Sequence, residues 1–225
     1  MIEIKNLSKS YGSNDVLKEI NLQFKPANAY GIVGNNGAGK TTLFRCLAGF
    51  ENYSGEISPS YYELKNQMGF LPTDPYFFPK ITGKEYLQLL CNAREVTIPN
   101  FESVNIFELP LSQYAENYST GMKKKLALTA ILLQKNEVFI LDEPFNGVDL
   151  HSNMMISEII NRLKEKGKTL LISSHIFSTL TQTCDCLHLL DNGIISKTVS
   201  KPDFDSLENE MKSLSISDKL SKLDL

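Results

Sequence analysis

GNNGAGKTT, residues 34–42, lies between an apolar run and a helical pattern. The run before it, YGIVG at 30–34, is short, continuous and rich in β-forming residues, as a strand covered on both faces should be. After it, Leu43, Phe44 and Leu47 recur at helical spacing, and Gly49 marks the expected end of the helix. The stretch therefore predicts a strand, a glycine-rich turn and a helix in direct succession.

The turn matches the P-loop pattern G-x-x-x-x-G-K-[ST] in the structural context that this pattern requires. Its glycines let backbone N–H groups turn toward an anion, and the helix N-terminus adds partial positive charge. Lys40 is expected to reach the β- and γ-phosphates of ATP, and Thr41 offers a hydroxyl to Mg²⁺. The predicted nucleotide-binding residues of the loop are Asn35, Asn36, Gly37, Ala38, Gly39, Lys40, Thr41 and Thr42.

Two further apolar runs, VFILD at 138–142 and TLLISS at 169–174, have the same character as the first. Between them, residues 151–167 show one apolar helical face and end at a glycine. Strands and helices that alternate in this way predict an α/β fold with a parallel sheet. In such sheets, ligands bind beyond the carboxyl ends of the strands.

Three acid–base side chains follow these runs at that edge. Asp142 closes one strand, where its carboxylate can hold Mg²⁺ against the phosphates, and Glu143 can orient or deprotonate an attacking water. His175 follows TLLISS and should emerge near the γ-phosphate. A carboxylate pair after a strand can also form a helix-capping turn, and a lone histidine is usually structural. His151 and His188 have no such placement and are interpreted as surface or packing residues.

The remaining segments show other patterns of apolar and polar residues. Residues 1–28 and about 56–72 contain alternating, strand-like pieces (MIEIKNL, NLQF, GEI and MGFL) that predict a small antiparallel layer. Residues 76–134 are predicted mostly helical, with a capping box from Thr82 to Glu85. LHLLDNGIIS at 187–196 predicts a hairpin, and a loosely docked helical tail is expected after it.

Composition limits the kinds of partner. The 225 residues carry a formal net charge of -3, which provides no general basic field for nucleic acid. Four cysteines are too few for a disulfide framework and are interpreted as reduced and structural. No apolar run approaches the roughly 18 residues that span a bilayer. We therefore expect a cytoplasmic chain that reaches a membrane only through a partner.

The following motifs occur in order along the chain: Tyr11, GNNGAGKTT, YSTGM, ILDEP, FNGVD and SSH. With this ordered set, the chain resembles the nucleotide-binding domain of an ABC (ATP-binding cassette) protein over about residues 1–200. The resemblance implies a P-loop NTPase core with a parallel sheet, a small antiparallel β subdomain and an inserted helical subdomain at about 76–134. Residues 201–225 would form a C-terminal helical tail.

In that family, two nucleotides are sandwiched head to tail between two subunits. By resemblance, Ser119 and Gly121 of YSTGM lie at a helix N-terminus that faces the γ-phosphate held by a neighbouring chain. Tyr11 resembles the aromatic residue that stacks on adenine, although it could equally pack an edge strand. Asp149 of FNGVD matches the aspartate that couples the two sites, although it could serve only as a helix cap. Glu143 matches the catalytic glutamate, and His175 the switch histidine.

Three lysines directly after YSTGM, at 123–125, stand near the positive end of the predicted helix, where cations are mildly unfavourable. An anion bound at that helix end would offset the effect. Taken one by one, the lysines are more simply explained by a solvated face.

Two positions depart from the family pattern. The usual signature is LSGGQ, and YSTGM keeps only its serine and second glycine, so that Thr120 restricts the loop. In GFLPTDP, Thr73 stands where a glutamine is usual, so contacts to Mg²⁺ and water from this loop are open, with Asp74 as an alternative donor.

The resemblance implies the ATP-hydrolysing subunit of a membrane transporter, similar to exporter subunits, that forms a homodimer or heterodimer and drives a separate permease at the inner face of the membrane. A soluble ABC ATPase, for example of the iron-sulfur assembly type, is the alternative, and a small-molecule kinase leaves YSTGM and FNGVD unexplained. Cargo and direction are not encoded in these motifs. The aromatic residues of DPYFFPK would most often be part of the core. The resemblance, however, places this segment at the cleft that receives a short helix of the membrane subunit, and we predict that Phe77 or Phe78 anchors that partner.

Overall fold

The computed structural model describes residues 1–208, and its centre is a six-stranded sheet in the order β5-β6-β7-β3-β8-β9. The first five strands in that order run parallel, and β9 pairs antiparallel with β8. The strands are β3 (Ala29–Val33), β5 (Met68–Leu71), β6 (Val138–Asp142), β7 (Thr169–Ser174), β8 (Cys186–Asp191) and β9 (Ile194–Ser200). The α/β fold with a parallel sheet is confirmed.

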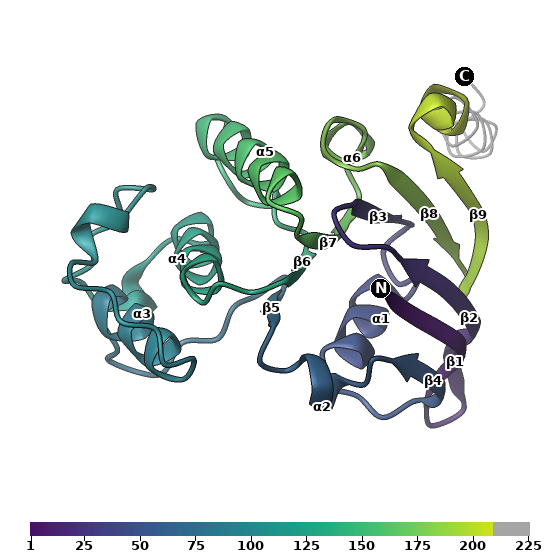
Figure 1. The fold of residues 1–225 in the computed structure, drawn as a ribbon, viewed down its shortest axis with the longest axis horizontal. Coiled ribbons are helices and arrows are strands. Elements are labelled where there is room, and N and C mark those ends of the chain that lie inside the picture. The colour runs from purple at the N-terminus through teal and green to yellow at the C-terminus, as the bar shows by residue number, and fades with distance from the viewer. Residues whose placement is uncertain (209–225) are drawn as a thin grey trace, which may run out of the picture.

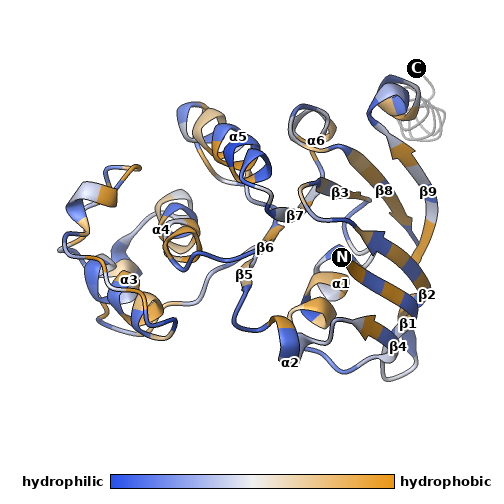
Figure 2. Ribbon diagram, viewed as in Figure 1, coloured by the Kyte–Doolittle hydropathy of each residue, from blue (hydrophilic) through white to orange (hydrophobic). Residues whose placement is uncertain are grey.

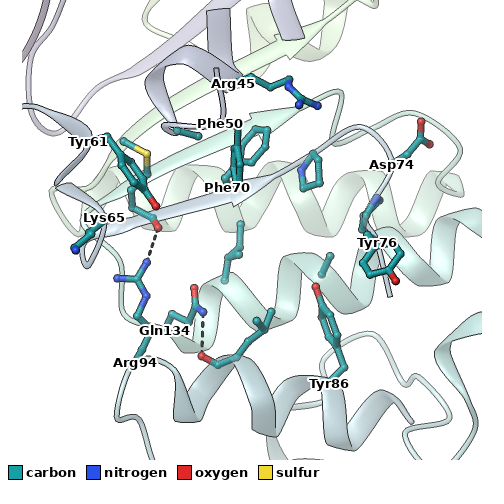
Figure 3. Close-up of a pocket in the computed structure, with 17 residues that line it drawn as sticks. Arg45, Phe50, Tyr61, Lys65, Phe70, Asp74, Tyr76, Tyr86, Arg94 and Gln134 are labelled. Atoms are coloured by element: carbon teal, nitrogen blue, oxygen red, sulfur yellow. Dashed lines mark hydrogen bonds between the residues drawn. The ribbon is translucent and has the colours of Figure 1, made fainter. Parts of the chain in front are cut away.

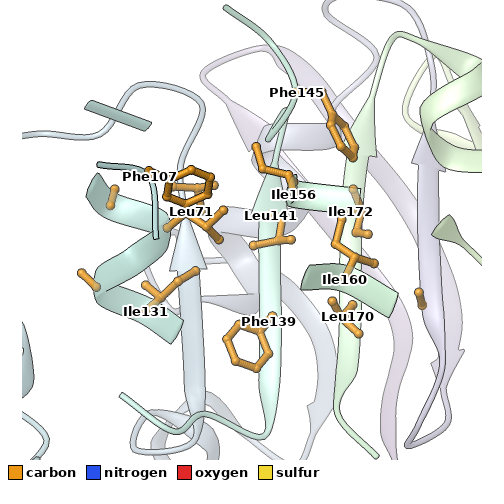
Figure 4. Close-up of a cluster of buried hydrophobic side chains, with 14 of the residues drawn as sticks. Leu71, Phe107, Ile131, Phe139, Leu141, Phe145, Ile156, Ile160, Leu170 and Ile172 are labelled. Carbon is orange, nitrogen blue, oxygen red and sulfur yellow. The ribbon is translucent and has the colours of Figure 1, made fainter. Parts of the chain in front are cut away.

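The core strands are continuous apolar runs because both faces of the sheet are covered. Alternate residues of β6 enter different clusters: Phe139 and Leu141 face one, and Val138 and Ile140 face the other. Figure 4 draws the first cluster, in which strand side chains meet helix α5 (Leu150–Glu165); the residues are Phe139, Leu141, Leu170, Ile172, Ile156 and Ile160.

Helices cover the sheet on both sides (Figure 1). Helix α5 and helix α6 (Phe177–Thr183) lie on one face. Helix α1 (Lys40–Leu47) lies on the other face, between the core sheet and a second sheet. Since β3 and β6 run parallel in one sheet, their carboxyl ends lie at the same edge, where the carboxyl-edge rule predicts a ligand site.

The second sheet is antiparallel, in the order β2-β1-β4, and includes β1 (Ile2–Tyr11), β2 (Asn14–Phe24) and β4 (Ser54–Ser58). Figure 2 shows hydrophobic and hydrophilic residues mixed along β1 and β2, as expected for strands with one covered face. This layer was predicted correctly except for MGFL. That segment is β5, which pairs parallel to β6 in the core sheet, and a four-residue strand is too short for its periodicity to reveal this.

A helical lobe projects to the left of the sheet in Figure 1 and contains α3 (Gly83–Asn92) and α4 (Thr120–Leu133). The predicted capping box begins α3: the Thr82 N–H donates to the Glu85 carboxylate at 2.8 Å, and the Glu85 N–H donates to Thr82 Oγ1 at 3.2 Å. Residues 93–119 contain only the short 3-10 turns Glu102–Val104 and Ala115–Asn117, so this lobe is less helical than predicted. A single turn of α-helix, α2 (Tyr61–Leu64), precedes β5.

The predicted hairpin at 187–196 is confirmed as β8 and β9, with Asn192 and Gly193 at positive φ in the turn. The start of the predicted tail docks tightly, because Phe204 and Leu207 are 3% and 1% exposed within the larger cluster. The remaining tail residues, 209–225, lie outside the described part. Within residues 1–208, every helix is too short or too polar to span a bilayer.

Candidate nucleotide site

A cavity of about 400 Å³ lies at the carboxyl ends of the core strands, next to the loop that joins β3 to α1. Its lining combines residues of this loop and of the start of α1, residues that follow β5, β6 and β7, and one residue of β2. They are Val16, Asn36, Gly37, Gly39, Lys40, Thr41, Thr42, Thr73, Glu143, Asn146 and His175.

The P-loop needs glycine at two positions. Gly39 caps α1 at φ +109°, a conformation that L side chains rarely adopt. A Cβ on Gly34 would come within 2.3 Å of the Leu190 carbonyl oxygen. These constraints keep the backbone wrapped closely around the cavity and leave the first N–H groups of α1 directed at it.

Lys40 starts α1 and is only 6% exposed, with its side chain folded into the loop. Its ammonium donates to the carbonyl oxygens of Gly34 at 2.7 Å and Asn35 at 3.2 Å. It also lies 3.9 Å from Glu143 Oε1. The Lys40 ammonium therefore already lies beside the position expected for the phosphates. Its carbonyl partners are uncharged, so an anion can replace them.

Asp142 is fully buried and its carboxylate is surrounded by hydroxyl groups. Thr41 and Thr73 donate to Oδ2 at 2.7 and 2.8 Å, and Ser173 donates to Oδ1 at 2.5 Å. Thr73, whose role was open, therefore contacts the predicted metal-binding carboxylate directly. One carboxylate with hydroxyl oxygens beside a phosphate cradle suits Mg²⁺, which usually binds one or two protein carboxylates together with substrate phosphates.

Glu143 lies at the mouth of the cavity with an unusual backbone. Its φ is +52°, a value at which non-glycine residues are strained. Its N–H donates to Ser173 Oγ at 2.9 Å, and its Oε2 lies 2.8 Å from His175 Nδ1. The tertiary structure therefore brings together the side chain predicted to act on the attacking water and the histidine predicted to lie near the γ-phosphate.

YSTGM lies apart from this cavity. Ser119 caps α4 by accepting the Met122 N–H at 3.2 Å, and it is exposed. A Cβ on Gly121 would come within 2.7 Å of the Gly147 carbonyl oxygen, so this helix start packs tightly against the FNGVD segment. The predicted helix N-terminus is therefore present and turned outward.

Asp149 caps α5, which confirms the structural alternative and leaves its second role as a prediction. It accepts the Ser152 N–H at 2.9 Å and the Ser152 hydroxyl at 2.7 Å. These bonds, together with the Lys125 ammonium at 3.4 Å, lower the pKa of Asp149. Lys125 thereby connects α4 to α5.

Lys124 was interpreted as part of a solvated face, and that interpretation is wrong. Its side chain is 1% exposed, and its ammonium donates to the carbonyl oxygens of Glu143 at 2.7 Å and Asn146 at 3.0 Å. Burial lowers the pKa of Lys124, while the negative charges of nearby carboxylates oppose the shift. A run of three identical residues carries no sign of which one turns inward.

Tyr11 lies at the end of β1, and its ring is 46% exposed. The Lys9 ammonium lies 4.7 Å from the ring centroid. The phenol is near Thr42, at the start of α1, and burial is the main cause that raises the pKa of Tyr11. Contact with adenine remains a prediction.

The structure thus divides the predicted residues into two groups. Most P-loop residues, Glu143 and His175 line one cavity, and Asp142 lies beneath it. Outside the lining are Tyr11, Asn35, Ala38, Ser119, Gly121 and Asp149. Sequence reasoning missed Asn146, Val16 and Lys124; Asn146 lies inside the FNGVD motif, which was a usable signal, whereas Val16 had none.

The ABC transporter family model matches residues 17–146. The chain belongs to the ABC transporter family. It is 28% identical to the bacitracin transport ATP-binding protein BcrA of Enterococcus faecalis, covering 97% of this chain and 75% of that protein. It is 29% identical to the lantibiotic transport ATP-binding protein SrtF of Streptococcus pyogenes, covering 93% of each.

Among solved structures, the dimeric ATP-binding cassette MJ0796, in a post-hydrolysis state bound to ADP and Pi, has a TM-score of 0.80 at 20% identity. The match covers 89% of this chain and 99% of that one, and at this identity it shows the fold. ATP-binding domains of the ABC transporter family are ATPases. In this family member, Lys40 and the Glu143 carboxylate line the same cavity, 3.9 Å apart.

Proposed function

We propose that this chain is the ATP-hydrolysing subunit of a membrane transporter, that it dimerises around two Mg·ATP, and that it drives a separate permease. One observation carries the proposal: the Glu143 carboxylate lies in the same cavity as Lys40, with its backbone bonded to Ser173 and its side chain to His175. A water molecule between Glu143 and a γ-phosphate held by the P-loop would be within reach of a base.

In the proposed reaction, Lys40 exchanges its carbonyl partners for the β- and γ-phosphates. Glu143 accepts a proton as the water oxygen bonds to the γ-phosphorus, and the bond from that phosphorus to the bridging oxygen breaks to give ADP and phosphate. His175, which touches Glu143 in the free chain, is positioned to hold the carboxylate and to contact the γ-phosphate. Positioning and charge stabilisation supply most of the rate in this chemistry.

Asp142, Thr41 and Thr73 are the residues that would hold Mg²⁺, because their oxygen atoms already converge beside the P-loop. Bound there with the phosphates, the ion would neutralise the charge that develops on them. The hydroxyl groups keep the buried Asp142 carboxylate oriented in the meantime.

The proposal that the chain dimerises rests on Ser119 and the N-terminus of α4, which face outward. Ser119 and the N-terminus of α4 present a hydroxyl and the first N–H groups of the helix, whose first turn holds no acidic residue, and no carboxylate of residues 1–208 is bonded to them. The N-terminus of a helix binds phosphate well, and the γ-phosphate held by a second subunit is the anion that this arrangement suits. The same logic applies to a homodimer and to a heterodimer of related chains.

The test is Glu143→Gln, which keeps the size of the side chain and removes the base. ATP binding should persist while turnover falls by roughly 10² to 10⁴. Because binding without hydrolysis cannot reopen the sandwich, ATP should also stabilise a dimer that size-exclusion chromatography with light scattering detects. Near-normal hydrolysis in this variant would remove Glu143 from the role of base.

We place permease docking at a second hollow, of about 450 Å³, between the end of α1, β5 and the helical lobe. Figure 3 shows aromatic side chains around it, with Phe50, Tyr61 and Phe70 on one side and Tyr76 and Tyr86 on the other. Exposed aromatics that rim a hollow are typical of protein interfaces. Its lining also includes the charged residues Arg45, Lys65, Asp74 and Arg94, and this mixture of aromatic and charged side chains suits a short amphipathic segment of a membrane protein.

The two phenylalanines of DPYFFPK have different environments. Phe77 is partly buried, with its ring centroid 4.6 Å from that of Tyr86. Phe78 is 54% exposed and lies 5.5 Å from the Tyr76 ring. Neither residue lines the hollow itself, but each contacts a tyrosine that does: Phe78 contacts Tyr76, and Phe77 contacts Tyr86. Phe78 is the better candidate anchor because it is the more exposed of the two.

Phe78→Ala should leave the thermal stability and the ATPase activity of the isolated chain unchanged but reduce the amount of membrane protein that co-purifies from detergent-solubilised membranes. Phe77→Ala is the control, because it should lower the stability of the chain itself. Unchanged co-purification and unchanged ATPase activity of the complex after replacement of both residues would exclude this docking site.

A further inference from the structure

Lys124 is a buried cation outside the proposed reaction. Its side chain is 1% exposed, and no carboxylate of residues 1–208 forms an ion pair with it. A methionine would fill a similar volume without the cost of desolvating an ammonium. The lysine at this position therefore has to be explained by what its ammonium donates to.

Both acceptors are backbone carbonyls at the edge of the nucleotide cavity. One belongs to Glu143, at 2.7 Å, and the other to Asn146, at 3.0 Å. Both of these residues also line the cavity. Glu143 adopts φ +52°, a strained value for a non-glycine residue, and both of its peptide groups have partners: its N–H donates to Ser173 Oγ, and its C=O accepts the Lys124 ammonium at 2.7 Å and the Asn146 N–H at 3.2 Å.

The backbone of Lys124 is part of α4, the helix that Ser119 caps. From Ser119 to Lys124 is little more than one turn of a continuous helix, so a movement of the helix N-terminus moves the ammonium as well. Lys124 is thus a short, rigid connection between the surface proposed to bind a partner's nucleotide and the backbone of this chain's own base.

The neighbouring lysines have different partners. Lys125 contacts Asp149 and Ser152 at 3.4 and 3.2 Å, which links α4 to the start of α5. Lys123 makes no side-chain hydrogen bond or ion pair within the described residues, and it is partly exposed. The three adjacent lysines are therefore chemically alike but differ in their bonding partners.

We propose that Lys124 is a positioning residue that fixes the backbone of Glu143 and Asn146 to α4, so that the base of one ATP site is aligned by the helix that completes the other site. The inference rests on the proposed function, in which Glu143 is the base. A carbonyl that loses a charged donor in a buried loop shifts to find another, and small displacements of a base cost much of its rate.

The experiment is a double-mutant cycle on the full-length chain, at a concentration where specific activity no longer rises, with single-turnover assays that follow labelled phosphate. Lys124→Met should lower kcat roughly 10- to 100-fold while the KM for ATP and the stoichiometry of bound nucleotide stay within about twofold. Lys123→Met, which removes the same charge from the same helix, should stay within about twofold of the parent in both constants.

The decisive comparison is made in the Glu143→Gln background. If Lys124 acts through Glu143, adding Lys124→Met there should lower turnover no further than about twofold. An equal loss in both backgrounds would overturn the inference, and so would an unchanged kcat in Lys124→Met alone. Near-parental turnover of Glu143→Gln by itself would instead contradict the proposed function, so the two failures are distinguishable.

Lys124→Gln provides a second variant in case Lys124→Met does not fold, as judged by circular dichroism and nucleotide stoichiometry. It keeps an amide donor and removes the charge. Its loss of kcat should likewise disappear in the Glu143→Gln background, and losses that multiply would overturn the proposal.

Discussion

In the cavity at the carboxyl edge of the core sheet, the charged side chains already have several polar partners, whereas at the N-terminus of α4 the Ser119 side chain has one within residues 1–208, the Met122 N–H. Asp142 accepts three hydroxyl groups, and Lys40 rests on two carbonyls. Ser119 is exposed, and its hydroxyl accepts the Met122 N–H of its own helix. One half of the proposed site is therefore organised before ATP arrives, and the other half depends on an anion from elsewhere.

This difference separates binding from turnover. A preorganised cradle can hold ATP within one chain, because it needs only to exchange weak partners for phosphate. Hydrolysis would require both halves, so that a lone subunit binds nucleotide and turns it over poorly. Substitutions in the two regions should consequently change the affinity for ATP and the rate of hydrolysis in different combinations.

The largest effect is expected in the inner region. Lys40→Met removes the ammonium proposed to bind phosphate, and we expect turnover to fall by about 10² to 10³ together with a loss of ATP affinity. Fluorescent-nucleotide titration and phosphate release measure the two effects. Lys84→Met, an exposed lysine in the first turn of α3, is the control and should change neither. If Lys40→Met kept the parent's affinity for ATP, the comparison would be wrong, since ATP binding would then not depend on the inner region.

Gly121→Val tests the outer region. The added side chain would clash with the Gly147 carbonyl, which a Cβ would approach to 2.7 Å, and would push the start of α4 away from its position. We expect turnover to fall about 10- to 100-fold while dilute, monomeric chains bind ATP with unchanged affinity. Weaker binding by the monomer would show that the two regions are not separate.

Ser119→Ala is a milder change at the same place. The loss of one hydroxyl contact to a phosphate should lower turnover about 10-fold, and the loss of the cap should lower the free energy of unfolding by about 1 kcal/mol. Thr82→Ala removes the matched cap of α3, which accepts the Glu85 N–H at 3.2 Å. This control should lose similar stability in chemical denaturation with no change in turnover per folded chain.

The smallest effect is expected at Thr73, where the inner region departs from the family pattern. Thr73→Val keeps the shape and removes the hydroxyl that donates to Asp142 at 2.8 Å. We expect the Mg²⁺ concentration for half-maximal turnover to rise only a few-fold, since Thr41 and Ser173 still orient the carboxylate. Thr73→Ser should behave like the parent. No change in the Mg²⁺ requirement would remove Thr73 from the proposed metal site.

Much of the inner region was predictable because its residues are close to one another in sequence and their conformations are local. The P-loop glycines, Lys40 and the strand before them specify the cradle by themselves. Asp142 and His175 were predicted from another local fact, that each follows a short apolar strand. Parallel strands then bring these ends to one edge whatever the loops between them do.

Neighbours in sequence proved harder to separate than distant residues. Lys123, Lys124 and Lys125 are identical in type, yet one is partly exposed, one is buried on two carbonyls, and one is paired with Asp149. Phe77 and Phe78 differ in the same way. The strand at 68–71 was assigned to the wrong sheet because four residues carry too little periodicity.

By itself, the sequence determined the α/β fold, the phosphate cradle and the carboxylates at the sheet edge, because glycine conformation, strand burial and helix capping act within a few residues. Only the tertiary structure decided that Thr73 and Ser173 meet on Asp142 and that Lys124 holds the backbone of Glu143. Those contacts join segments far apart in the chain, and which of several equivalent side chains makes them depends on how the helices pack against the sheet.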